Sequence, residues 1–214
     1  MIVVSEEVRE ASAVVALETT LIAHGFPGGE GVAVGLESER LVREAGAVPA
    51  TIGVLDGELR VGLTEDELTR FDAGARKVGP RDLAACVVQG AIGATTVGGT
   101  LAVCRAAGIR FMGTGGLGGV HRGFPHPPDV SADLGGGGLL LARPPDRSLD
   151  DVEPLIEEAL AEAERRGVTG QAVTPFVLSF LHERSEGQTL VANRELVVAN
   201  AGLAAEVAVS SASA

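Results

Sequence analysis

Residues 109–133 read I-R-F-M-G-T-G-G-L-G-G-V-H-R-G-F-P-H-P-P-D-V-S-A-D, and they guide the interpretation of the whole chain. Residues 109–112 form a short apolar run typical of a buried strand. The glycines that follow leave the backbone almost without side chains, so several N–H groups can approach one oxyanion. His121, Arg122, Asp129 and Asp133 come next. These donors and carboxylates beside a glycine-rich loop favour a site for a phosphate together with a metal ion or sugar hydroxyls.

Two other interpretations of this stretch are weaker. Residues 113–118 fit the dinucleotide fingerprint G-x-G-x-x-G, which requires a helix to begin inside the motif. The prolines at 125, 127 and 128 exclude that helix, so a nicotinamide or flavin site is disfavoured. A glycine-rich turn without a ligand is also disfavoured, because so many glycines are costly in chain entropy.

Composition sets the class of protein. The 214 residues are enough for one α/β domain with its own core. The net charge of −12 argues against nucleic acid as a partner but allows a small anionic substrate in a local positive pocket. Cys86 and Cys104 lie on separate apolar patterns, which indicates buried, reduced thiols. We find no signal peptide and no apolar run of transmembrane length, so we expect a soluble cytoplasmic protein with no membrane partner.

The order of expected elements predicts the fold class. Strands are expected at residues 13–17, 48–55, 109–112 and 139–141, and a hairpin turn at Asp56-Gly57. Helices are expected at residues 31–45, 83–89, 101–107, 150–166 and 189–209. Four or five strands alternating with helices predict a mostly parallel central sheet with helices on both faces, an α/β/α single domain.

Several side chains are candidates for a site at the carboxyl ends of the strands. Glu18 directly follows a buried strand, where α/β sheets place catalytic groups, although it could also cap a helix or pair with an arginine. Val97 lies among small residues at another strand end, where a ligand can approach the backbone. Lys77 is expected in a loop, where a lysine can contact a ligand but is more often solvated. His182 lies among Glu and Arg on a helix, which favours a surface position.

A series of motifs resembles the pseudouridine-5′-phosphate glycosidase family. The first group runs in family order through V-V-A-L-E-T-T-L-I-A-H-G-F-P (14–27), G-A-V-P-A-T-I-G-V-L-D-G (46–57), R-K-V-G-P-R-D-L (76–83), G-A-T-T-V (93–97), G-T-G-G-L-G-G-V-H-R-G (113–123) and D-V-S-A-D (129–133). The resemblance resumes in L-A-E-A-E-R-R-G-V-T-G-Q-A-V-T-P-F (160–176) and L-V-A-N-R-E-L-V-V-A-N-A (190–201).

The resemblance implies a glycosidase of nucleotide catabolism, classed as a hydrolase or lyase. It would reversibly cleave the C–C glycosidic bond of pseudouridine 5′-phosphate to uracil and ribose 5-phosphate, with a divalent ion, typically manganese, in a homotrimer. By position, Glu18 matches the proton donor, Lys77 and Val97 match substrate contacts, and Asp129 matches the metal ligand. Ser131, Ala132 and Asp133 match the segment around the ribose and the metal-bound water. Thr114, His121 and Arg122 match contacts with the phosphate and the ring-opened sugar. Asn193 matches a polar group near the base.

The chain departs from the family pattern after Leu134. The family carries a lysine that forms an imine with the sugar shortly after S-A-D-L, but here four glycines follow and then a stretch that resembles a much later part of the family. The single domain, residues 1–214, is therefore expected to have an internal deletion near 134–139, and Arg143 replaces a family asparagine. Lys77 is the only lysine and would have to serve as both contact and amine. An active enzyme and a non-catalytic relative that binds ribose phosphate or uridylate, or joins family trimers, both remain open.

Overall fold

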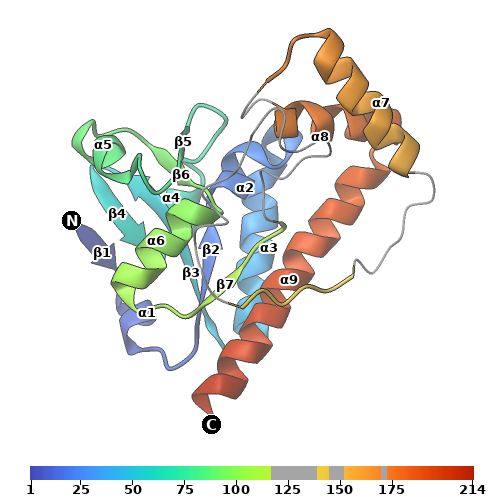
Figure 1. Cartoon of the computed structure of the whole chain (residues 1–214). Coiled ribbons are helices and arrows are strands. Elements are labelled where there is room, and N and C mark those ends of the chain that lie inside the picture. The colour runs from blue at the N-terminus through green and yellow to red at the C-terminus, as the bar shows by residue number, and fades with distance from the viewer. Residues whose placement is uncertain (117–138, 145–151, 170–172) are drawn as a thin grey trace.

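A seven-stranded sheet with helices on both faces forms the fold of this computed structural model, which describes residues 1–116, 139–144, 152–169 and 173–214 (Figure 1). The strands are β1 (Ile2–Val4), β2 (Val14–Glu18), β3 (Val48–Leu55), β4 (Glu58–Val61), β5 (Arg76–Val78), β6 (Gly93–Thr95) and β7 (Phe111–Gly113). The helices are α1 (Glu6–Glu10), α2 (Thr20–His24), η1 (Pro27–Gly29), α3 (Glu30–Glu44), α4 (Glu65–Leu68), α5 (Leu83–Val88), α6 (Val97–Ala107), α7 (Val152–Arg165), α8 (Val173–Arg184) and α9 (Gln188–Ala212).

The sheet is mostly parallel, as predicted, but contains more strands than the four or five expected. Its main order is β1-β4-β3-β2-β7, and β6 joins β3 and carries β5 on its outer side. Four strand pairs are parallel, β1–β4, β2–β3, β2–β7 and β5–β6, whereas β3 pairs antiparallel with β4 and with β6. The β3–β4 hairpin turns at Asp56 and Gly57, both with positive φ, which confirms the predicted turn.

Two predictions about strands were wrong. Residues 139–141 are not a strand and their leucines are exposed, because a strand needs a neighbour that accepts its backbone hydrogen bonds. Lys77 lies in strand β5 rather than in a loop. The backbone N–H of Arg76 donates to the Ile92 carbonyl at 2.8 Å, and this pairing with the chain before β6 makes the segment a strand.

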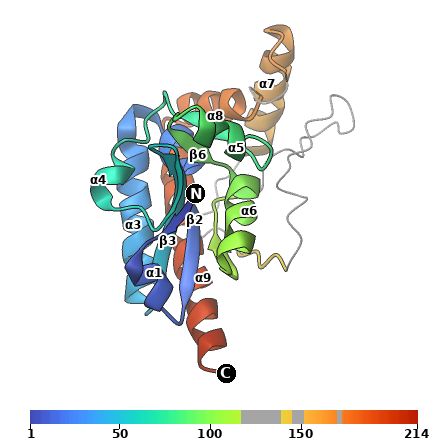
Figure 2. The same ribbon diagram turned by 90° about the vertical axis from the view of Figure 1, so that its left-hand side faces the viewer.

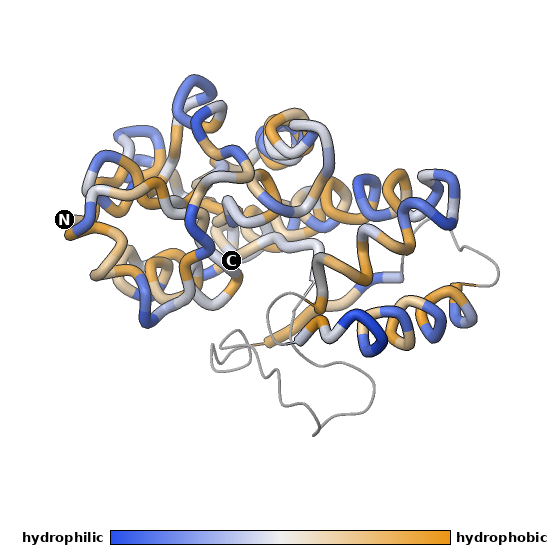
Figure 3. Tube along the Cα trace, turned by 90° about the horizontal axis from the view of Figure 1, so that it is seen from above, coloured by the Kyte–Doolittle hydropathy of each residue, from blue (hydrophilic) through white to orange (hydrophobic). Residues whose placement is uncertain are grey.

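The two faces of the central strands bury different helices. One cluster joins β2 to α3 and α9 through Ala13, Val15, Leu17, Val42, Ala47, Ala201, Ala205 and Ala208. On the other face, a second cluster joins the sheet to α1 and α6 through Val8, Ala16, Ala50, Ile52, Val61, Val103 and Cys104. Figure 2 shows the sheet between α3 and α6, which confirms the layered α/β/α arrangement. Hydrophobic and hydrophilic residues follow each other along the helices in Figure 3, as expected of helices with one packed side.

Helix α9 is the longest described helix and packs along the core. By length and hydropathy it is also the one described helix that qualifies as a candidate membrane span, which the sequence analysis did not expect. In the fold its alanines pack on β2 and α3, and Arg194 donates to Glu37 Oε2 of α3 at 2.7 Å. A long helix that packs in a protein core can be as apolar as a helix that crosses a membrane, so its length and hydropathy alone do not distinguish the two.

Both cysteines are buried, as predicted, and we expect them to be unreactive in the folded protein. Cys86 is 0% exposed and Cys104 is 4% exposed. Burial raises the pKa of the Cys104 thiol to about 12 and also raises the pKa of Cys86. Iodoacetamide at pH 8 should therefore leave both thiols unlabelled until denaturant is added. Labelling of either cysteine in the native protein at the rate of a free thiol would contradict this burial.

Candidate active site

Glu18 and Thr114 meet where two neighbouring strands end. Glu18 is the last residue of β2, and its neighbour Leu17 pairs with Gly113, the last residue of β7. The Thr114 hydroxyl donates to Glu18 Oε1 at 2.6 Å, and Asn200 of α9 donates to the Thr114 carbonyl at 2.9 Å. Glu18 is 7% exposed. Glu18 is therefore a buried carboxyl group held in one position at the end of a strand, which is where the sequence placed it.

Buried threonines join the ends of β2 and β6. The Thr19 hydroxyl donates to the Ile52 carbonyl at 2.8 Å and accepts from the Thr95 backbone N–H at 2.8 Å. The Thr95 hydroxyl donates to the same Ile52 carbonyl at 2.7 Å. Helix α6 begins just after, at Val97, which is buried rather than in the expected loop. The carboxyl ends of β2 and β6 thus lie together, although β6 runs antiparallel to β3.

Lys77 lies on the next strand outward from this junction. Strand β5 pairs with β6 so that Lys77 is opposite Ala94, whose carbonyl accepts a hydrogen bond from the Thr20 hydroxyl of α2 at 3.1 Å. The Lys77 side chain is exposed, and none of the residues in the described ranges forms an ion pair or hydrogen bond with its ammonium group. Its cation therefore remains available to a ligand.

His24 lies beside Lys77 and was missed by the sequence analysis. It ends α2, one helical turn after Thr20, and its ring is half-buried. His24 Nε2 is shielded from solvent and has no hydrogen-bond partner. Burial, and then the positive charge of Lys77, lower the pKa of His24, while the Ala75 carbonyl acts in the opposite direction. The imidazole is therefore mostly neutral at pH 7. Its place six residues after Glu18, in a Gly/Pro-rich segment, was the one available signal.

His182 is not the surface residue that was predicted. Its ring is half-buried between α8 and α9, with Nδ1 2.8 Å from the Thr189 hydroxyl, and Nε2 is shielded without a partner. Burial alone lowers the pKa of His182. It has no neighbouring lysine, so it provides a matched comparison for His24.

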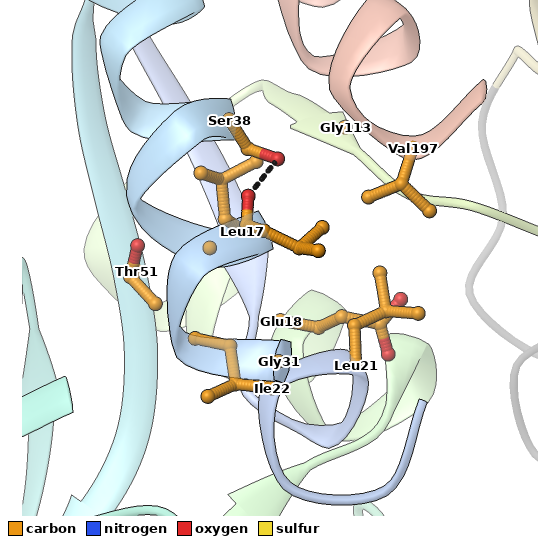
Figure 4. A pocket seen from close by; sticks show the side chains of 11 residues that line it. Leu17, Glu18, Leu21, Ile22, Gly31, Ser38, Thr51, Gly113 and Val197 are labelled. Atoms are coloured by element: carbon orange, nitrogen blue, oxygen red, sulfur yellow. Dashed lines mark hydrogen bonds between the residues drawn. The ribbon is translucent and has the colours of Figure 1, made fainter. Parts of the chain in front are cut away.

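A small apolar cavity lies beside Glu18 (Figure 4). Its volume of about 20 Å³ has room for roughly one water molecule. Leu17, Leu21 and Val197 turn their side chains toward it, and the Ser38 hydroxyl at its edge already donates to the Val34 carbonyl at 2.8 Å. Asn193, one turn before Val197 on α9, shares that side of the helix.

Much of the predicted site lies outside the described residues. This applies to His121, Arg122, Asp129, Ser131, Ala132 and Asp133, and to the glycines at 135–138. Glu18, Lys77, Val97, Thr114 and Asn193 lie within the described ranges. Across those ranges, no group of three or more His, Cys, Asp or Glu side chains could hold a metal ion.

Glu39 of α3 is a second carboxyl group that accepts a hydrogen bond from a threonine. Its environment predicts how the stability of the protein changes with pH. The Thr51 hydroxyl donates to Glu39 Oε1 at 2.5 Å, and burial raises the pKa of Glu39 above its ordinary value. The folded state thus binds this proton more readily than the unfolded state. The contribution of Glu39 to stability is therefore greatest below the unfolded pKa and declines as pH rises through the folded one. We expect Glu39→Gln to raise Tm at pH 7.5 and to raise it less at pH 5; a fall in Tm at pH 7.5 would contradict this.

One family model and several curated proteins match the chain. A model described as "Indigoidine synthase A like protein" matches residues 3–136 and 136–210. A pseudouridine-5′-phosphate glycosidase from Chloroflexus aurantiacus is 36% identical over 301 aligned positions, covering 98% of this chain and 98% of the relative. One from Salinispora tropica is 36% identical over 292 positions, covering 98% and 90%. Because these alignments are longer than the 214 residues of the chain, the relatives contain residues that have no counterpart here.

Two solved structures share the fold. The prealnumycin C-glycosynthase AlnA, in complex with ribulose 5-phosphate, aligns with a TM-score of 0.87 and 29% identity, covering 100% of this chain and 97% of that chain. An indigoidine synthase A-like protein from Thermotoga maritima aligns with a TM-score of 0.75 and 28% identity, covering 99% and 97%.

Proposed function

The chain belongs to the indigoidine synthase A-like family, and we propose that it reversibly cleaves the C–C glycosidic bond of pseudouridine 5′-phosphate, giving uracil and ribose 5-phosphate. The observation that carries this proposal is Glu18, a buried carboxyl group held by Thr114 at a strand end, in a chain of which 98% aligns with a curated glycosidase of this substrate. The ribulose 5-phosphate bound to AlnA is a phosphorylated sugar of the same class as the proposed product.

Glu18 would move the proton that this reaction requires. Uracil leaves the sugar carbon only if its own carbon takes up a proton as the C–C bond breaks. The hydrogen bond from Thr114 fixes the position of the Glu18 carboxyl group, and the apolar wall of Leu17, Leu21 and Val197 keeps bulk water from it. Lys77, whose ammonium group has no partner in the described part of the chain, would contact the phosphorylated sugar.

The remaining site assignments follow the family motifs. We assign the phosphate and the opened sugar to Thr114, His121 and Arg122, the ribose to Ser131, Ala132 and Asp133, and the backbone at Val97 to a further substrate contact. Asn193 would lie near the base, since it shares a helix side with Val197 beside the cavity. We also propose that the protein is a cytoplasmic homotrimer.

We propose that the divalent metal of the family, manganese, binds at Asp129. The described residues form no metal-binding group, so this assignment depends on the D-V-S-A-D motif alone. A bound divalent ion would orient oxygen atoms of the sugar phosphate. Equilibrium dialysis against Mn²⁺ tests the assignment: the native chain should retain the ion and Asp129→Ala should not.

We further propose that the chain is one domain that lacks an internal segment near residues 134–139. The two matches to the family model meet at residue 136, and the aligned relatives have residues without counterparts in this chain. The family's imine-forming lysine would fall in that segment.

This loss favours a second candidate function, a non-catalytic protein that binds ribose phosphate or uridylate. Chromatography of uracil released from pseudouridine 5′-phosphate separates the two. The glycosidase should release uracil from this substrate and none from uridine 5′-phosphate, whose base is attached through nitrogen. Binding of ribose 5-phosphate by calorimetry, without release of uracil, would establish the second candidate instead.

A further inference from the structure

The position of Lys77 matters for the imine-forming step, because this chain lacks the lysine that performs that step in the family. The threonine contacts join the ends of β2 and β6, and Lys77 lies on the strand next to β6. It is the only lysine in the sequence, so no other side chain offers a primary amine. Its exposed side chain has no acidic partner among the described residues, so no ion pair blocks its approach to a ligand.

A base for this amine lies beside it. An ammonium group attacks carbon only after it has lost a proton, which a neighbouring base can accept. His24 is fixed near Lys77 because Thr20, one turn earlier on α2, bonds to the carbonyl of Ala94, the strand partner of Lys77. The shielded His24 Nε2 has no partner, and such an unpaired buried nitrogen in a native protein calls for an explanation.

We propose that Lys77 supplies the amine of the reaction in this chain and that His24 accepts its proton. This inference rests on the proposed function and deepens it, because it assigns the covalent step to residues that no family motif assigns to it.

The covalent step forms a C–N bond and opens the sugar ring. His24 removes a proton from the Lys77 ammonium group, and the amine nitrogen bonds to C1′ while the C1′–O4′ bond breaks and O4′ takes the proton from His24. The new C1′-bound ammonium nitrogen then gives one proton to the Glu18 carboxylate. Its freed electron pair forms the protonated imine as the C1′–C5 bond to uracil breaks, and Glu18 gives its proton to C5. Water hydrolyses the imine, which releases ribose 5-phosphate and restores the Lys77 amine.

The charged groups around His24 define its pH response. On the strands beside α2, Lys77 is the charged group in the described part of the chain that acts on His24, and the Ala75 carbonyl is the opposing dipole. No carboxylate among the described residues of α3 or β6 shifts its titration. The neutral imidazole should therefore be the active base at pH 7 and should lose this role as pH falls.

Reductive trapping tests Lys77. Ribose 5-phosphate and sodium borohydride are added to the full chain, and the labelled peptide is identified by mass spectrometry. We expect one sugar-phosphate adduct, on Lys77, and none with Lys77→Arg, which keeps the positive charge. The control is the double variant Arg76→Lys, Lys77→Arg, which moves the single lysine to the opposite side of the strand. Equal labelling of this control would mean non-specific alkylation and would overturn the proposal.

The pH dependence of trapping tests His24. In the native chain the rate of adduct formation should fall as pH is lowered through the range of a histidine. His24→Gln should lower the rate at pH 7.5 by about 10²-fold and remove that dependence. His182→Gln, which changes a histidine of similar burial away from Lys77, should match the native chain. If His24→Gln does not fold by circular dichroism, His24→Asn replaces it, and an unchanged pH profile in the folded variant overturns the role of His24.

The same samples separate this proposal from the proposed function. Release of uracil without an adduct on Lys77 would overturn the assignment of the amine and leave the glycosidase intact. Binding of ribose 5-phosphate with neither adduct nor uracil would overturn both.

Discussion

Glu18→Gln is expected to lower kcat for uracil release by about 10²- to 10⁴-fold, the range over which a positioned proton donor acts. The glutamine keeps the size of the side chain and can still accept the hydrogen bond from the Thr114 hydroxyl, but it has no proton to transfer. Binding of ribose 5-phosphate should therefore be nearly unchanged. Steady-state kinetics on pseudouridine 5′-phosphate and calorimetry with ribose 5-phosphate measure the two quantities.

Glu39→Gln is the matched control for Glu18→Gln. Glu39 is also a carboxyl group that accepts from a threonine, but it lies along α3 and bonds to Thr51 rather than to the residue after β7. This variant should keep kcat within about twofold, because Glu39 bonds to Thr51 and makes no contact with Glu18 or Thr114. Equal kcat values for the native chain and Glu18→Gln would contradict the assigned role of Glu18.

Gly31→Ala is expected to destabilise the protein by about 3 kcal/mol, near the upper end for overpacking a core. A Cβ at this position would lie 1.8 Å from the Ile22 carbonyl oxygen and 2.6 Å from the Ile22 carbonyl carbon. These are backbone atoms of α2, so the clash cannot be relieved by rotating a side chain. Helix α2 would have to move away from α3, and His24 would move with it. Urea unfolding measures the loss of stability.

Gly202→Ala is the control for this substitution. Gly202 lies inside helix α9, and a Cβ there would make ordinary contacts with Leu41, the nearest at 3.5 Å. Alanine loses less chain entropy than glycine in a helix, so this variant should be neutral or more stable by about 0.5–1 kcal/mol. If Gly31→Ala proved as stable as Gly202→Ala, the close approach of α2 and α3 would be wrong.

The sequence predicted the parts of the fold that depend on local patterns. Strand β3 matches the expected residues 48–55, and the Asp56-Gly57 turn leads into β4 as expected. Strand β5 was missed because its three residues carry no alternation, and it forms only because β6 pairs with it. The antiparallel pairing of β6 with β3 depends on tertiary packing, which no local sequence motif predicts.

The candidate site divides in the same way. The position of Glu18 was predictable, because it directly follows an apolar run and β2 ends there. His24 was not, because a single histidine in a Gly/Pro-rich segment has no distinguishing pattern. Its proximity to Lys77 depends on the pairing of β5 with β6 and on the bond from Thr20 to Ala94. These contacts join segments that are far apart in the sequence.

The most direct test of the proposed function is to run the reaction from both sides. Purified protein is incubated with pseudouridine 5′-phosphate in one sample, and with uracil and ribose 5-phosphate in another, and both are followed by liquid chromatography with mass spectrometry. A reversible C-glycosidase should bring the two samples to the same ratio of pseudouridine 5′-phosphate to uracil. If neither sample changes while ribose 5-phosphate still binds, the chain is a binding protein and the proposed activity is wrong.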